Sequence, residues 1–404
     1  MAKILISSLG TGRNIKDSDS EYQSTTYIID DKSYENETFI SKALIEHFKI
    51  DKVILLGTNK SMWDGAYLGF TNNSLDENWE ILNDAKLDKG IEEEHLKLIE
   101  DVLNKYTNQE GSKCLLVKYG QNKDEMWDNF EIMYKINQYI RKGDEVYLDI
   151  THAFRSLPVL LFIVMEFMHM MREDFELSGL LYGMLSNEKS PVIDLKIFFE
   201  LLDWAKAVNN FKNYANSGQL VKLMIETDVD KQVRKTFHQL GQNVRIANMA
   251  SLWQFIKGAN KKIKFIENSN NKIVKLLSKD VLEIVNRLNK DKMSDFQYEL
   301  AWWFYENKNY ALSYMALAEA IITKTCELKF PDANAEDKYV REDAKRNIDY
   351  PYSRLYFSYK DRDTISEIRN NIAHQLSDRK DKVNQDIQKL EFFLKEFKAY
   401  FDKE

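Results

Sequence analysis

Cysteine is nearly absent from this chain of 404 residues. Its only two cysteines, Cys114 and Cys326, lie far apart, and neither belongs to a Cys-x-x-Cys pair or a Cys/His cluster. This argues against a zinc site and against a disulfide framework, because both need several cysteines or histidines at close spacing. The sequence therefore predicts a cytoplasmic protein that holds no metal ion and no resident cofactor.

Long hydrophobic runs are absent as well. The most apolar stretch, 157–171, contains Glu166 and His169 and is shorter than the roughly 20 residues that cross a bilayer. Residues 1–6 lead directly into a strand-like segment and lack the basic, apolar and small-residue regions of a signal peptide. We expect a protein that is neither exported nor bound to a membrane, with a buried helix at 157–171.

Glycine is missing from the last third of the chain. Of the 14 glycines, 12 lie at or before Gly218 and none follows Gly258. The charge changes too: residues 1–200 hold 22 Lys+Arg against 35 Asp+Glu, and residues 201–404 hold 35 against 29. These two changes predict two domains, 1–200 and 201–404.

In the first domain, apolar or β-branched runs recur and several are separated by helix-like stretches. This alternation predicts an α/β, Rossmann-like fold with a largely parallel sheet, whose ligand lies beyond the C-terminal ends of the strands. The predicted strands are 3–8, 25–29, 52–56, 113–118, 145–151 and 177–185, and the predicted helices are 39–48, 91–106, 125–139 and 157–171.

The loop after the first predicted strand, Ser7 to Arg13, is rich in small residues. Such residues let backbone amides approach a phosphate, and Arg13 adds positive charge. The alternative is a simple tight turn. The dinucleotide pattern Gly-x-Gly-x-x-Gly is broken because Ile15 occupies its third glycine position, which disfavours a nicotinamide oxidoreductase.

A second loop, 149–158, concentrates polar groups just before a predicted helix. It brings together an acid, an imidazole, a guanidinium and two hydroxyls, from Asp149, His152, Arg155, Thr151 and Ser156. This set is suited to a phosphate at the helix N-terminus and to a ribose or base beside it. In the alternative interpretation, Asp149 or Ser156 only caps the helix and His152 satisfies a backbone group.

The second domain is predicted to be all-α. Helical periodicity occurs at 220–225, 233–240, 272–288, 297–324 and 382–400, and the charged segment 332–350 is predicted to be a surface loop. The aromatic cluster at 302–305 is interpreted as core in preference to an RNA-stacking platform. Residues 231–280 hold 11 basic and 2 acidic side chains, which indicates either a polyanion-binding surface or a solvated lysine-rich face.

The hexamer from Arg369 to His374 places a permanent cation near a proton carrier. These two groups are suited to cleave RNA without a metal, because histidine moves protons near neutral pH and guanidinium stabilises charge on a phosphate. The apolar stripe Ile365, Ile368, Ile372 and Leu376 predicts a helix. On one helix, Arg369 and His374 would lie about 140° apart, so two copies meeting at a two-fold axis would form a better site. The alternative is a surface Arg with a helix-facing His.

Two of these motifs carry a family resemblance. Asp149-Ile150-Thr151-His152-Ala153-Phe154-Arg155 resembles the Asp-x-Thr-His-Gly-x-Arg motif of CRISPR-associated Rossmann fold (CARF) proteins, and the hexamer resembles the Arg-x4-His motif of HEPN ribonucleases. The chain is similar over nearly its whole length to the CARF–HEPN ribonucleases of type III CRISPR systems. Ala153 stands where the family has glycine, so the loop conformation can differ there.

The resemblance implies a cyclic oligoadenylate as allosteric activator, bound across a CARF dimer; cyclic tetra-adenylate is favoured over the hexa-adenylate. Ligand contacts are expected from three loops, which contribute Ser8, Gly10, Thr11, Gly12 and Arg13; Lys60, Ser61 and Trp63; and Thr151, His152, Arg155 and Ser156. Trp63 is expected to stack on adenine or to be a core anchor, and Lys60 to meet phosphate. Slow cleavage of the activator near Thr11, Thr151 and His152 is left open.

For catalysis, we expect His374 to assist proton transfer as a ribose 2′-hydroxyl attacks the neighbouring phosphate, with Arg369 stabilising the anionic transition state and Asn370 orienting one of these groups. The expected partners are single-stranded RNA and a second copy of the chain, in a homodimer or higher oligomer, without stable membership of the CRISPR effector complex. The alternative function is a ligand-gated binding module whose helical domain docks a partner.

Overall fold

The structure is a computed structural model that describes residues 1–12, 22–71, 74–152, 156–184, 189–357, 363–374 and 382–401. The chain divides into two compact units, Met1–Leu201 and Leu202–Glu404. In the described residues, no helix is long and apolar enough to cross a membrane.

The first unit is built around an eight-stranded sheet in the order β3-β2-β8-β7-β6-β1-β4-β5. Five neighbouring strands from β7 to β5 are parallel, and β8 pairs antiparallel with β7. The strands are β1 (Lys3–Leu9), β2 (Thr25–Ile29), β3 (Lys32–Glu37), β4 (Lys52–Gly57), β5 (Lys113–Leu116), β6 (Glu145–Asp149), β7 (Glu176–Gly183) and β8 (Ser190–Asp194).

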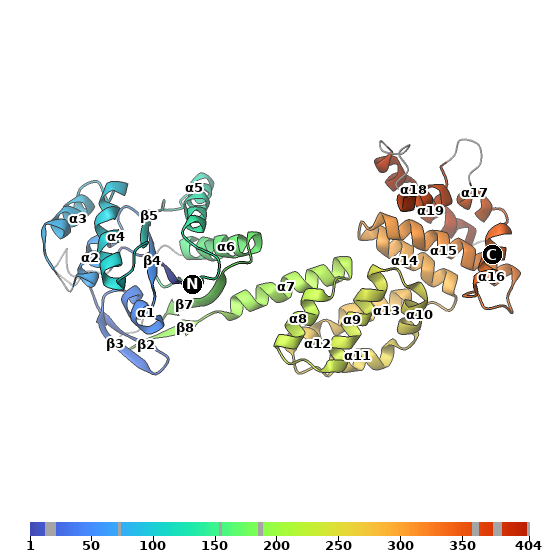
Figure 1. The fold of residues 1–404 in the computed structure, drawn as a ribbon, viewed down its shortest axis with the longest axis horizontal. Coiled ribbons are helices and arrows are strands. Elements are labelled where there is room, and N and C mark those ends of the chain that lie inside the picture. The colour runs from blue at the N-terminus through green and yellow to red at the C-terminus, as the bar shows by residue number, and fades with distance from the viewer. Residues whose placement is uncertain are drawn as a thin grey trace. The chain divides into compact units, whose positions relative to one another are not determined.

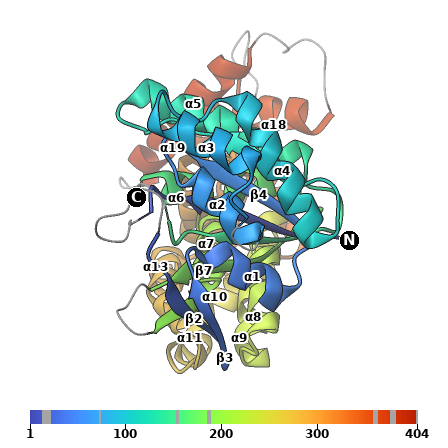
Figure 2. The ribbon, with the colours of Figure 1, turned by 90° about the vertical axis from the view of Figure 1, so that its left-hand side faces the viewer.

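Successive side chains of β1 point to opposite faces of the sheet. Both sets include apolar residues, and helices cover both faces. Leu5 and Leu9 pack with α1 (Ile40–Phe48), α2 (Trp63–Phe70), α3 (Glu77–Leu87) and α4 (Glu93–Thr107), and Figure 2 shows α2, α3 and α4 in front of the sheet. Ile4 and Ile6 pack with α5 (Lys123–Tyr134), η1 (Lys135–Gln138) and α6 (Ser156–Met171) on the other face (Figure 1).

The strand order reverses direction at β1. The chain proceeds from β1 to β4 and β5 on one side, and β6 and β7 lie on the other side. The loops after β1 and β6 therefore leave the sheet next to each other at its carboxyl edge, which is where such sheets bind ligands. The predicted fold class, a Rossmann-like α/β domain followed by a helical domain, is confirmed.

In the described part of the second unit, all regular structure is helical. Two helices predicted as continuous are interrupted: Leu277 separates α12 from α13, and residues 307–309 separate α14 from α15. The segment 332–350, predicted as a loop, contains α16. The helices are α7 (Ile197–Tyr214), which begins in the first unit, α8 (Gly218–Glu226), α9 (Lys231–Arg245), α10 (Met249–Lys257), α11 (Ala259–Glu267), α12 (Lys272–Leu276), α13 (Ser278–Leu288), α14 (Met293–Glu306), α15 (Tyr310–Lys329), α16 (Lys338–Arg346), α17 (Tyr352–Tyr356), α18 (Ile365–His374) and α19 (Val383–Phe401).

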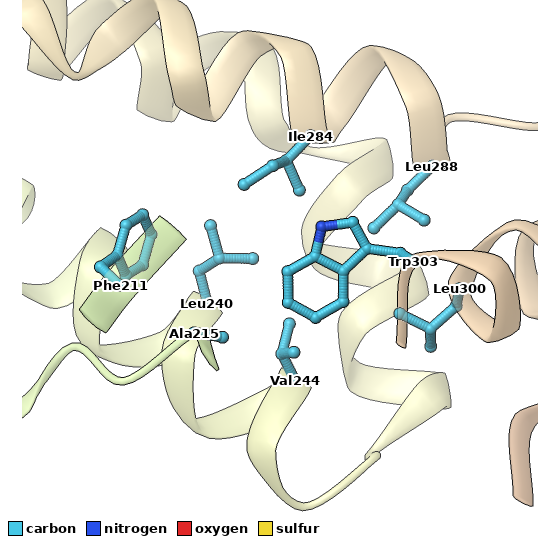
Figure 3. Close-up of a pocket in the computed structure, with 8 residues that line it drawn as sticks. All are labelled: Phe211, Ala215, Leu240, Val244, Ile284, Leu288, Leu300 and Trp303. Carbon is cyan, nitrogen blue, oxygen red and sulfur yellow. The ribbon is translucent and has the colours of Figure 1, made fainter. Parts of the chain in front are cut away.

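The helical core is closely packed around Trp303. This side chain and Phe304 are buried, which confirms the interpretation of the aromatic cluster as core. Figure 3 shows Trp303 surrounded by apolar side chains from several helices, with a void of only about 10 Å³ between them. That volume is at the lower limit for one water molecule, and its lining offers apolar side chains. The void is a packing defect and does not suggest a ligand site.

Candidate ligand and nuclease sites

The loops after β1 and β4 are fastened to each other at the carboxyl edge of the sheet. The hydroxyl of Ser61 donates a hydrogen bond to the carbonyl oxygen of Leu9 (2.9 Å), and the N–H of Met62 donates to the carbonyl oxygen of Gly10 (2.9 Å). Ser61 is buried. Its hydroxyl therefore supports the backbone of the loop after β1. In this conformation it does not face solvent, where the predicted ligand contact would need it.

Trp63 lies inside the core. Its indole N–H donates to the carbonyl oxygen of Thr58 (2.8 Å), and its side chain is 0% exposed. The ring lies so close to Gly57 that a Cβ at that position would be 2.6 Å from it. The prediction that Trp63 stacks on adenine is wrong for this conformation, and the core-anchor alternative is confirmed, because no face of the ring is accessible.

Lys60 is directed toward the end of α3. Its ammonium donates to the carbonyl oxygens of Lys86 (2.6 Å) and Asp88 (2.8 Å). Cations near a helix C-terminus are favoured because the last carbonyls lack partners within the helix. In this structure the Lys60 ammonium satisfies those carbonyls, so the predicted phosphate contact would require it to leave them.

Ser8 differs from these residues because its hydroxyl is buried without a hydrogen-bond partner among the described residues. It lies on the same side of β1 as Ile4 and Ile6, which pack toward α5 and α6. Beyond it, Gly10 is half-buried and Thr11 and Gly12 are exposed.

A buried polar cluster holds the far end of the β1 loop. The hydroxyl of Tyr22 donates to Asp64 (2.8 Å) and accepts from the ammonium of Lys86, which also lies 3.3 Å from Asp64. Burial and the nearby Asp64 carboxylate raise the pKa of Tyr22. A Cβ at Gly12 or at Gly65 would be 2.4 or 2.6 Å from the Tyr22 ring. The ring thus fits between two glycines, and Gly12 cannot carry a side chain without displacing it.

Asp149, at the end of β6, ties the two central loops together. Its buried carboxylate accepts from the hydroxyl of Ser7 (2.5 Å) and from the N–H of Thr151 (2.9 Å). Burial raises the pKa of Asp149, and hydrogen bonds and His152 oppose this effect. Asp149 therefore fixes where the β6 loop leaves the sheet relative to β1. Both of its carboxylate oxygens accept hydrogen bonds within the protein, which is a positioning role.

The next two residues are partly engaged within the protein. The hydroxyl of Thr151 accepts from the N–H of Gly183 (2.8 Å), and Nε2 of His152 lies 3.4 Å from the hydroxyl of Tyr27. Burial lowers the pKa of His152, while Asp149 acts in the opposite direction. A neutral imidazole is therefore favoured, able to exchange hydrogen bonds without bringing positive charge.

The helix α6 begins at Ser156, beside the loop that follows β5. A Cβ at Gly120 would lie 3.6 Å from the Ser156 hydroxyl, so the Ser156 side chain lies next to that loop. Arg13, Ala153 and Arg155, which were predicted to contribute charge and loop conformation, lie outside the described residues. The described candidates that the structure gathers at this edge come from the loops after β1 and β6.

The outer face of α6 was not expected from the sequence. Leu157, Leu161 and Met168 are buried, as predicted, but the opposite face is apolar and open. It exposes five large side chains at helical spacing: Val159 58%, Ile163 53%, Phe167 41%, Met170 59% and Met171 66%. The prediction of a buried helix is therefore wrong for one face. A helix that is apolar on all sides needs a packing partner on each of them. The apolar residues all around 157–171 could therefore have predicted a second contact surface.

The hexamer lies on α18, as predicted. Ile365 and Ile368 are buried, but Ile372 is 43% exposed, so the apolar stripe continues beyond the area that this unit covers. Leu376 lies outside the described residues. His374 is the last residue of α18 and is exposed. In the described residues no hydrogen bond joins Arg369 to His374, in keeping with their expected angular separation.

Arg369 is held by neighbouring polar groups. Its Nη2 lies 3.7 Å from Oε1 of Glu319 on α15, and its Nη1 donates to the side-chain oxygen of Asn370 (3.1 Å). Arg341, from α16, pairs with the same Glu319 and also donates to the hydroxyl of Thr323 (2.9 Å). Glu319 and Arg341 were missed because no sequence pattern links them to the hexamer. The described part of the chain contains no group of three or more His, Cys, Asp or Glu placed to hold a metal ion.

Two family models match the chain. Residues 4–185 match the CARF domain of the CRISPR system endoribonuclease Csx1, and residues 200–295 match the second domain of the CRISPR-associated protein MJ1674. The first unit is thus similar to a CARF domain of a CRISPR-associated protein. Neither match extends to the hexamer on α18.

Individual proteins show the same relationship. The chain is 31% identical over 406 residues to the CRISPR-associated protein MJ1674 of Methanocaldococcus jannaschii, and the match covers 93% of this chain and 62% of that protein. It spans less than two thirds of that relative. Among solved structures, Csm6 of Enterococcus italicus bound to cyclic hexa-2′-fluoro-hexa-dAMP aligns with 98% of this chain and 92% of its own, at 13% identity and a TM-score of 0.38.

Proposed function

We propose that this protein is a metal-independent endoribonuclease that a cyclic oligoadenylate activates in type III CRISPR antiviral defence. The observation that carries the proposal is the match of residues 4–185 to the CARF domain of an endoribonuclease, in a chain that also has Arg369 and His374 on one helix. Neither half alone specifies a regulated nuclease. The proposal assigns a CARF sensor domain to residues 1–200 and a HEPN nuclease domain to residues 201–404.

The ligand site of the proposal is the carboxyl edge of the sheet. The exposed Thr11 and Gly12 and the start of α6 at Ser156 support an anionic ligand there, because backbone amides of a small-residue loop and of a helix N-terminus favour phosphate. Ser8 is also assigned to the site, although its side chain is buried in this conformation. His152 would contact a ribose or base as a neutral group. A cyclic tetra-adenylate is favoured over the hexa-adenylate by resemblance alone.

A second copy of the chain is part of the proposal. The apolar outer face of α6 begins beside the proposed ligand site. Because its large side chains are already about half buried, covering the rest would contribute roughly 1 kcal/mol for each. On α18, the exposed Ile372 likewise continues an apolar stripe onto an uncovered surface. Pairing of copies would cover both faces and would give the two hexamers a common phosphate.

In the proposed reaction, His374 assists removal of the proton from a ribose 2′-hydroxyl, which attacks the adjacent phosphorus as the 5′-oxygen departs. Arg369 stabilises the added negative charge, while Glu319 and Asn370 orient its guanidinium. The products carry a 2′,3′-cyclic phosphate and a 5′-hydroxyl. The substrate is single-stranded RNA, since DNA lacks the attacking hydroxyl.

The alternative is a ligand-gated binding module without catalysis. It is favoured by the ion pair between Arg369 and Glu319, because such a pair can also serve a purely structural role. Cleavage of labelled RNA, titrated against cyclic tri-, tetra- and hexa-adenylate, separates the two. The nuclease predicts saturable activation by one ring size that persists with a chelator. Binding of a cyclic adenylate without RNA cleavage would support the module.

A further inference from the structure

One face of α12 and α13 gathers lysines around a hollow. Lys272, Lys275 and Leu276 lie on α12, and Lys279 lies in the first turn of α13, just after the break at Leu277. Together with Glu267 and Ser278 they line an open depression of about 400 Å³. We call this surface the lysine face; it lies on different helices from Arg369 and His374.

The charge of the lysine face is not balanced within the protein. In the part of the chain that the structure describes, Lys272, Lys275 and Lys279 form no ion pair, and Glu267 is the only acid that lines the depression. Other lysines of the helical unit are paired, for example Lys212 with Asp280. Like charges gathered on one face repel, so the face lowers the stability of the unit unless an anion covers it.

The surroundings strengthen this positive field. Lys261 and Lys264 are exposed on α11, which packs against α12 and α13. Within 231–280 the chain has 11 basic and 2 acidic residues. Leu276 is 70% exposed in the centre of the lysine face, so an apolar surface lies between the ammonium groups. A ligand suited to this face has repeated negative charges and flat or apolar parts between them.

We propose that the lysine face binds single-stranded RNA away from the cleavage site, with the three lysines contacting phosphates and Leu276 contacting a base. This inference deepens the proposed function, because it assigns a second contact to the same substrate. Lysine binds phosphate as a point charge without reading sequence, and each phosphate contact releases counterions. The site therefore increases affinity for RNA strands long enough to reach it, whatever their sequence.

The test measures binding of a fluorescein-labelled single-stranded RNA by anisotropy, using full-length protein with His374→Ala so that the RNA stays intact. The triple variant Lys272→Glu, Lys275→Glu, Lys279→Glu should bind at least about tenfold more weakly near 50 mM salt. Its plot of log affinity against log salt should be shallower by about 2, because three single-strand phosphate contacts at about 0.7 each are lost.

A matched control reverses the same amount of charge elsewhere in the unit, with Lys222→Glu, Lys338→Glu and Lys395→Glu, and should bind within about twofold of the parent. A neutral triple Lys→Gln variant, checked for folding by circular dichroism, should lose affinity to an intermediate extent. Equal affinity and equal salt dependence in the triple variant and the control would overturn the proposal. Loss of association between copies with unchanged RNA affinity would also overturn it, and would assign the face to the acidic N-terminal half of a second copy.

Failure of this inference can be told apart from failure of the proposed function. RNA binding that depends on the lysine face, in a wild-type protein that no cyclic adenylate activates, would support the face and contradict the nuclease. Activated cleavage with lysine variants that bind RNA normally would support the nuclease and contradict the face.

Discussion

At the carboxyl edge of the sheet, polar groups are buried and paired with one another, whereas on α18 they lie at a helix end and are largely open. Asp149 and Asp64 have partners at 2.5–2.8 Å, but Arg369 is 3.7 Å from Glu319 and His374 is exposed. The first arrangement is preorganised within one chain, as a binding site requires. In the second, Arg369 is held by Asn370 and Glu319 but no hydrogen bond among the described residues joins it to the exposed His374, so the site makes better chemical sense when another surface completes it.

The largest effect on this comparison is expected from removing the imidazole of His374 on α18. His374→Ala should reduce RNA cleavage by about 10²–10⁴-fold, because a proton-transfer group is lost. Binding of a cyclic oligoadenylate, measured by calorimetry, should not change. His238→Ala, on the exposed side of α9, is the matched control and should keep full activity. Equal cleavage by the two variants would remove His374 from the mechanism.

The outer face of α6 tests whether a second copy is needed. Ile163→Asp should raise the dimer dissociation constant by about 100-fold, because roughly 1.5 kcal/mol of apolar burial is lost in each of the two copies. Sedimentation equilibrium measures this constant. Ile81→Asp on α3 changes an isoleucine of similar exposure and should leave association intact. If Ile163→Asp associates like the control, α6 is not the contact between copies.

The cluster around Tyr22 tests how firmly the ligand edge is preorganised. Tyr22→Phe keeps the ring between Gly12 and Gly65 but leaves Asp64 without one donor, which should cost about 1–3 kcal/mol of unfolding free energy. Urea unfolding followed by fluorescence gives the value. Tyr214→Phe, at an exposed position, should be neutral. A neutral Tyr22→Phe would mean that the hydroxyl contributes little to this edge.

The smallest expected effect concerns His152. Because burial lowers its pKa, the unfolded chain takes up a proton below about pH 6.5 that the folded protein resists. Stability should therefore fall as the pH drops through this range, by at most about 1.4 kcal/mol per pH unit. His152→Gln should make the dependence shallower, and His238→Gln should not. Unfolding curves at several pH values provide the comparison.

The sequence predicted that the loops after β1 and β6 follow neighbouring strands, because its signals are local. Small residues after β1 and polar residues after β6 follow apolar strands, and parallel pairing of β1 with β6 brings them together. Strand β3 escaped prediction because its side chains are polar and mostly exposed, so it lacks the alternation of a half-buried strand. The sequence also could not decide whether Trp63 is buried, because nothing in the pattern around it indicates the direction of the indole.

The α18 site was predicted only in part. The spacing of Ile365 and Ile368 fixed the helix, and the angle between Arg369 and His374 indicated an incomplete site. Glu319 and Arg341 come from other helices, and their approach to Arg369 depends on tertiary packing that one sequence does not encode visibly. The same holds for α16, whose charged residues gave no apolar stripe.

The open face of α6 also places two methionines where oxidants can reach them. Met170 and Met171 stand 59% and 66% exposed at its end. Oxidation converts a methionine into a polar sulfoxide, so an oxidant would change the chemical character of this surface without altering the sequence. Protein aged in air would then behave like the Ile163→Asp variant, and methionine sulfoxide reductase would restore it.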